Sequence, residues 1–125
     1  TMPTNVLAAI DDAVEFAMTA PGTQLQIGRL GEGWIAEEAL AISLACALAY
    51  PEDWSSAVLL AVNHGGDSDS TGAITGALLG ARLGMEAIPL AWSHDVECAS
   101  ELVAIADRLS DTVRGEASFS WVDGV

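Results

Sequence analysis

Two aspartates, Asp67 and Asp69, stand one residue apart in the stretch NHGGDSDSTGAITGALLGARLG, which covers residues 63–84. The chain thus places two like charges just before a run with hardly any other charge. Neighbouring carboxylates repel each other, and burying them unpaired costs several kcal/mol. Solvent, a helix N-terminus or a bound cation must therefore compensate them. Together with the hydroxyl of Ser70, they form an oxygen-rich set of the kind that magnesium prefers.

Three known motifs could explain this pattern. A calcium-binding EF-hand loop would place Asp67, Asp69 and Thr71 at its positions 1, 3 and 5, but its twelfth position is Leu78 instead of glutamate. A DxDx[TV] phosphatase loop should follow a buried strand and use a lysine, whereas a helix is predicted before it and the chain has no lysine. A magnesium site at the start of a helix remains, with capping of that helix as the plain structural alternative.

The composition of the chain excludes several classes of function. Its 125 residues are 51% hydrophobic, which indicates one domain with a core and excludes a disordered tail. A net charge of −14 makes nucleic acid a poor partner, and the absence of lysine excludes a P-loop or a Schiff base. Cys46 and Cys98 have no CxxC spacing, which is typical of reduced thiols in a cytoplasmic protein. No uncharged run is long enough to span a bilayer, so we expect a cytoplasmic protein without a membrane partner.

Hydrophobic periodicity predicts a single all-α domain over residues 1–125, with at least five helices and no sheet of more than two short strands. The first helix follows Thr4 as a cap and carries an apolar stripe of Val6, Ile10, Val14 and Ala17. Residues 22–34 are predicted to be a loop, since they contain four glycines. The other helices are predicted over residues 34–50, 52–62, from the DSD stretch to Gly84, and 95–114.

The helix that follows the aspartates carries glycine at every fourth position. Gly72, Gly76, Gly80 and Gly84 form a ridge with almost no side chain, and three alanines run beside it. An internal glycine costs about 0.5–1 kcal/mol of helix stability relative to alanine. We therefore expect close packing of backbones along this ridge, with residues 72–84 forming the most buried helix.

The stretches GEGWIAEEALAISLACALAY and AVLLAVNHGGDSDSTGAITGALLGA resemble the ADP-ribosylglycohydrolases, which include the dinitrogenase-reductase-activating glycohydrolases. The likeness is weaker through GMEAIPLAW and the last helix. It implies an all-α orthogonal helical bundle around two magnesium ions, for which manganese could substitute. It also implies that Asp67, Asp69 and Ser70 are metal ligands, and that the substrate-binding residues are Gly31, Glu32, Gly33, Trp34, His64, Gly65 and Gly66. His64 beside the acids could equally be a histidine bonded to a loop carbonyl.

The resemblance further implies magnesium-dependent hydrolysis that releases ADP-ribose from a modified target. Family members are more than twice as long, and their N-terminal half supplies an acidic catalytic candidate and a Thr-Asp-Asp metal cluster. Asp11 and Asp12 lie inside a predicted helix and do not match that cluster. We therefore expect this chain to be the C-terminal half, with no catalytic residue of its own and with the N-terminal half or a complementing chain as partner. The alternative is a catalytically inactive binding module that keeps the metal-loop fold.

Overall fold

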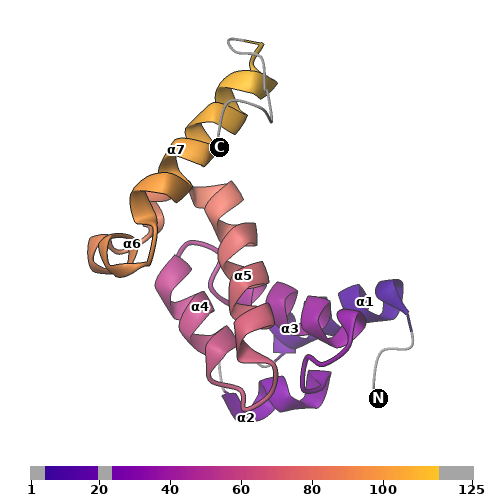
Figure 1. Cartoon of the computed structure of the whole chain (residues 1–125). Coiled ribbons are helices and arrows are strands. Elements are labelled where there is room, and N and C mark those ends of the chain that lie inside the picture. The colour runs from indigo at the N-terminus through magenta and orange to yellow at the C-terminus, as the bar shows by residue number, and fades with distance from the viewer. Residues whose placement is uncertain (1–4, 20–23, 116–125) are drawn as a thin grey trace. The chain divides into compact units, whose positions relative to one another are not determined.

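The computed structural model describes residues 5–19 and 24–115, and every element within them is a helix, which confirms the all-α prediction. The chain divides into two compact units, Thr1–Pro89 and Leu90–Val125, and each is described by itself. The single domain over residues 1–125 stays a prediction. The elements, labelled in Figure 1 where there is room, are α1 (Val6–Thr19), α2 (Gln24–Ile27), η1 (Gly28–Leu30), α3 (Ala36–Ala49), α4 (Trp54–Val62), α5 (Ser68–Leu83), η2 (Met85–Ala87), α6 (Leu90–Asp95) and α7 (Ala99–Val113).

Two predicted segments differ from the structure. The loop expected over residues 22–34 is helical at α2 and η1, and its first two residues lie outside the described part. The last helix was expected over residues 95–114, but α6 begins earlier, just after Pro89, and a break separates it from α7. Proline suits the residues that open a helix because its φ is already helical. Thr4, the expected cap of α1, also lies outside the described residues, and the Asn5 side chain accepts the Ala8 N–H at 2.9 Å.

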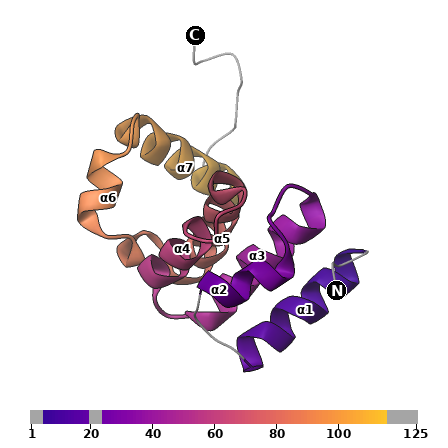
Figure 2. The same ribbon diagram turned by 90° about the horizontal axis from the view of Figure 1, so that it is seen from below.

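The core of the first unit is built around α3, which contacts α1, α4 and α5. Figure 2 shows α1 running alongside α3. Ala9 and Ala13 of α1 and Ala41 and Ala45 of α3 are fully buried, because short side chains let two helices approach closely. Larger side chains complete this cluster, namely Phe16, Ile27, Leu30, Ile42, Cys46 and Leu60.

Most of the apolar stripe expected on α1 lies on the face of the helix that is exposed to solvent. Val6, Ile10 and Val14 are 54%, 37% and 40% exposed, whereas the buried positions of α1 are Ala9, Ala13 and Phe16. The helix thus has apolar residues on two faces. The face that carries Ala9 and Ala13 packs on α3. The periodicity of α1 predicted a helix correctly but did not indicate which face is buried.

The prediction that α5 is the most buried helix is wrong. It buries three residues, Thr71, Thr75 and Leu79, whereas α3 buries eight. The glycine ridge is close-packed over its first two positions, where a Cβ would lie 2.6 Å from a methyl carbon of Val62 at Gly72 and 3.3 Å from the Trp54 ring at Gly76. A Cβ at Gly80 would meet no described atom within 4 Å, and Gly84 ends the helix with a φ of +81°. Close packing explains the first glycines, and helix termination explains the last.

Exchanging glycine for alanine at Gly72 and at Gly80 should therefore have opposite effects. Gly80→Ala should raise the free energy of unfolding by about 0.5–1 kcal/mol, since alanine is the better helix former and the space is open. Gly72→Ala should lower it, because the stiff Val62 side chain must move away. Urea unfolding of both variants checks this, and equal shifts would contradict the assignment of the packed end.

Buried hydroxyl groups join α3 to α5. Ser43, Thr71 and Thr75 are all fully buried. The Ser43 hydroxyl donates to the Thr71 carbonyl at 3.2 Å, and the Thr75 hydroxyl lies 2.8 Å from that carbonyl oxygen. On the α4 side, the Trp54 indole N–H donates to the Gly76 carbonyl at 3.0 Å. Satisfied buried hydrogen bonds of this kind hold α5 in one register against its neighbours.

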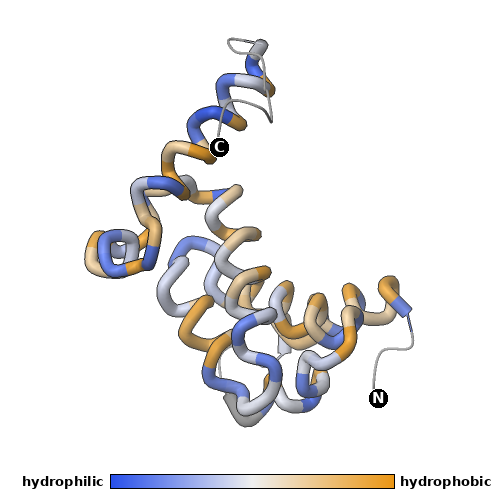
Figure 3. Tube along the Cα trace, viewed as in Figure 1, coloured by the Kyte–Doolittle hydropathy of each residue, from blue (hydrophilic) through white to orange (hydrophobic). Residues whose placement is uncertain are grey.

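The second unit contains α6 and α7. Leu102, Ile105 and Leu109 recur along α7 at helical spacing and are about half exposed. Figure 3 shows hydrophobic and hydrophilic stretches alternating along α7. Over residues 5–19 and 24–115, none of the helices has both the length and the apolar character that crossing a membrane requires.

Candidate functional site

The loop of residues 31–34 and the segment before α5 meet through their backbones. The Asp67 N–H donates to the Glu32 carbonyl at 2.7 Å. Gly66 lies so close to the same peptide that a Cβ there would be 1.9 Å from the Glu32 carbonyl oxygen. On the other side, a Cβ at Gly33 would lie 3.1 Å from a methyl carbon of Thr71. Both sequence segments that carry the predicted site residues are thus brought together, and glycine is what permits the approach.

A buried carboxylate fixes the loop of residues 31–34. Glu38, in the first turn of α3, is 4% exposed, and its Oε2 accepts the N–H groups of Glu32 and Gly33, both at 3.1 Å. Gly31 has a φ of +120°, and a Cβ there would lie 2.4 Å from Glu38 Cδ. The sequence placed an acidic pair, Glu37 and Glu38, in the favourable first turn of a helix, but it did not single out Glu38. The only signal in the sequence was that Glu38 stands in the first helical turn after a glycine-rich loop.

Thr71 fastens the start of α5 to the end of α4. Its hydroxyl oxygen lies 2.9 Å from the Ala61 carbonyl, 3.0 Å from the Asp67 carbonyl and 2.9 Å from His64 Nε2. A hydroxyl has one proton, so it donates to a carbonyl and accepts from the histidine. Thr71 is therefore a structural residue beneath the aspartates.

His64 holds the turn that leads into α5. Its half-buried ring accepts the Gly66 N–H at Nδ1, at 3.2 Å, so the proton of the neutral ring sits on Nε2 and is donated to Thr71. Burial lowers the pKa of His64, opposed by the negative charge of Asp67, and the neutral ring is the form that makes both bonds. The ring therefore bonds to a hydroxyl and a backbone N–H, and not to the loop carbonyl considered from the sequence.

Asp67, Asp69 and Ser70 lie together at the N-terminus of α5. Asp67 occupies the N-cap position, yet its side chain makes no capping hydrogen bond within the described first turn. Its pKa lies below the ordinary value because the side chain of Asp69, and then the hydroxyl of Ser70, hydrogen-bond to it.

Asp67, Asp69 and Ser70 offer oxygen donors of the kind that a divalent cation requires. Two carboxyl groups and a hydroxyl are hard oxygen donors, which fit Mg²⁺ or Mn²⁺ and not a soft metal. Octahedral Mg²⁺ takes six oxygens. Within residues 5–19 and 24–115, His, Cys, Asp and Glu side chains nowhere gather in threes so as to hold a metal ion. The residues present therefore fit one part of a magnesium shell.

The rim of the site is open to solvent. Trp34 is 67% exposed, and its indole N–H donates to the Glu32 carboxylate at 3.1 Å. Asp69 and Gly65 are also exposed. Within the loop itself, Gly31 and Gly33 are buried. Exposed groups of the loop and of the first turn of α5 are thus both accessible to solvent.

The sequence model of the ADP-ribosylglycohydrolase family matches residues 2–118. No solved structure matches the chain. The family match includes both segments of the candidate site and extends beyond them through α1 and α7. This match covers nearly the whole chain, and the chain belongs to the ADP-ribosylglycohydrolase family.

Proposed function

We propose that this chain supplies the metal-binding aspartates of a magnesium-dependent ADP-ribosylglycohydrolase, which hydrolyses the bond between ADP-ribose and a modified target. One observation carries the proposal: Asp67 and Asp69 open α5 at the point where the Asp67 N–H bond to the Glu32 carbonyl joins the start of this helix to the loop of residues 31–34. Membership of the family supports the reaction class.

In this proposal Asp67, Asp69 and Ser70 hold the cation, which is Mg²⁺ or Mn²⁺. Such an ion supplies positive charge that orients ribose hydroxyl groups and lowers the pKa of a water molecule. The chain's own contribution is positioning, because Thr71 and His64 fix the start of α5 beneath the two carboxyl groups. A carboxylate pair held in place loses little entropy on binding a cation.

The loop of residues 31–34 would border the ADP-ribose. Glu38 uses its carboxylate to fix two N–H groups of this loop, so the loop backbone is already ordered before a ligand arrives. Trp34 offers an exposed aromatic face at the rim, and such faces suit nucleobases and sugars. Gly65 is exposed and has no side chain, so it leaves the backbone before α5 accessible to a ligand.

The three oxygen donors of this site leave other positions of a six-oxygen magnesium shell to be filled by partners. Further carboxylates from an N-terminal half or a complementing chain would complete the shell, and the completed site would hold a second ion. The ligand of the site is ADP-ribose or an ADP-ribosylated target.

We also propose a cytoplasmic location. Burial raises the pKa of the Cys46 thiol to about 12, which keeps it protonated and inert, as suits a reduced structural cysteine.

Magnesium titration by calorimetry tests the proposal. The chain alone should bind Mg²⁺ weakly, with a Kd of about 1 mM or above, because three ligands leave most of the hydration shell in place. Asp67→Asn or Asp69→Asn should abolish that binding, whereas Asp107→Asn, an exposed position on α7, should leave it unchanged. Adding the complementing half should raise the affinity sharply and produce magnesium-dependent release of ADP-ribose.

Two results would contradict this account. Unchanged magnesium binding in both aspartate variants would remove the site from the N-terminus of α5. Tight binding, or ADP-ribose release, by the chain alone would show that it builds its site without another segment. Binding of ADP-ribose with no hydrolysis by the complemented protein would instead favour the inactive binding module.

A further inference from the structure

A second candidate site lies in a cavity between α1 and the segment formed by α2 and η1. Its volume of about 300 Å³ is at the lower end of the range for small-molecule sites. Phe16 and Leu30 line it and are only 7% and 6% exposed, so its floor is apolar and already packed. None of its described lining residues belongs to the candidate metal site.

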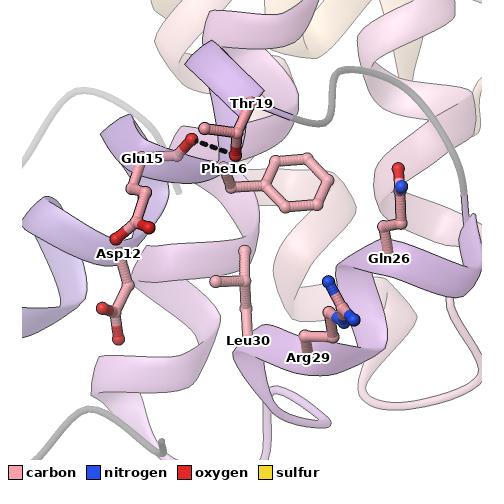
Figure 4. Close-up of a pocket in the computed structure, with 7 residues that line it drawn as sticks. All are labelled: Asp12, Glu15, Phe16, Thr19, Gln26, Arg29 and Leu30. Atoms are coloured by element: carbon pink, nitrogen blue, oxygen red, sulfur yellow. Dashed lines mark hydrogen bonds between the residues drawn. The ribbon is translucent and has the colours of Figure 1, made fainter.

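Opposite charges stand on the two sides of this cavity. Figure 4 shows Asp12 and Glu15 of α1 on one side and Arg29 of η1 on the other, with Phe16 and Leu30 between them. Across the described chain, the Arg29 guanidinium forms no ion pair with either carboxylate. Among the described residues, the acidic side and the basic side of the cavity are therefore not joined by an ion pair.

We infer that this cavity binds a small zwitterion with an apolar body, the chemistry of a free aliphatic amino acid. The ammonium group would face Asp12 and Glu15, and the carboxylate would accept two N–H groups from the planar fork of Arg29. The aliphatic side chain would lie over Phe16 and Leu30, whose apolar surfaces offer water no hydrogen bonds. A cation alone would satisfy one side of the cavity only.

Charge also disfavours a simple anion as the ligand. The chain carries a net charge of −14, so an anion without an ammonium group is repelled by the whole molecule and by the two carboxylates of the cavity. A zwitterion has no net charge and presents each end to the opposite sign. The arrangement thus selects for both charges on one small molecule, and this selection does not depend on the proposed hydrolase activity.

Titration of the ¹⁵N-labelled chain with L-leucine, followed by NMR, tests this inference. Leucine should cause saturable shifts at the backbone amides of Phe16, Arg29 and Leu30. Isopentylamine lacks the carboxylate of leucine and 4-methylpentanoate lacks its ammonium group, so each should bind at least about tenfold more weakly. Absence of saturable shifts at these amides, or equal affinity for all three compounds, would overturn the inference.

Two variants locate the binding. Arg29→Gln should raise the Kd for leucine about tenfold, because the charged fork is lost while most of the side-chain volume stays. Arg108→Gln removes the same charge from α7 and should change nothing. The spectrum of each variant shows whether it is folded. Unchanged affinity in Arg29→Gln, or equal weakening in both variants, would show that leucine does not use this cavity.

Discussion

Gly66→Ala is expected to lower the free energy of unfolding by about 4 kcal/mol or more. The new Cβ would lie 1.9 Å from the Glu32 carbonyl oxygen, and backbone at such a contact cannot turn aside as the end of a side chain can. The two segments must separate, which breaks the Asp67 N–H bond to Glu32 and leaves that carbonyl without its partner. Urea unfolding measures the loss, and magnesium binding should disappear with it.

Gly65→Ala is the matched control for this prediction. Gly65 has a φ of +88°, so alanine there is strained by about 1–2 kcal/mol, but its Cβ would meet no described atom within 4 Å. The difference between the two neighbouring variants isolates the close approach from the effect of backbone conformation. Similar losses for both would show that residue 66 does not lie against residue 32.

Glu38→Ala is expected to cost about 3–5 kcal/mol. It removes the acceptor of two backbone N–H groups, those of Glu32 and Gly33, in a place that solvent hardly reaches. Each bond to a charged acceptor is worth about 1.5–3 kcal/mol, and the lost side chain also leaves a cavity. Denaturant unfolding gives the cost, and amide hydrogen exchange at residues 32 and 33 shows whether these two groups have lost protection.

Glu37→Ala serves as the control for Glu38→Ala. It removes the same charge from the same turn of α3, so both variants lose a similar helix-dipole interaction. Glu37 makes no hydrogen bond to the loop among the described residues, and its loss should stay below about 1 kcal/mol. If the two variants were equally destabilised, the loop would not depend on the buried carboxylate.

Glu38 and Gly66 act on the same loop from opposite sides, so their effects should not simply add. Both act on the peptide that joins Glu32 to Gly33, since Glu38 accepts its N–H group and Gly66 packs against its carbonyl. Once either contact is lost, the loop is already loose and the second change removes less. A double variant should therefore cost less than the sum of the two single ones, and the shortfall measures how strongly the contacts cooperate.

The sequence alone determined the helical class and the position of the acidic pair. Periodicity over 14 residues is a local property, and it placed α3 within two residues of its observed ends. Local capping chemistry also explains why α4 begins at Trp54, since the Asp53 carboxylate accepts the Ser56 N–H at 3.0 Å. Asp67 and Asp69 were expected where a glycine-rich helix begins, and α5 begins there. These features need only neighbouring residues.

Tertiary structure decided which residues face which. Gly66 could not be distinguished from Gly65 by sequence, because the difference is the Glu32 carbonyl, more than 30 residues away along the chain. The buried face of α1 depends on the fit of its alanines to those of α3, and the burial of α5 depends on how many neighbours surround it. A local pattern records the conformation of a segment, whereas burial and close approach depend on which other segment packs against it.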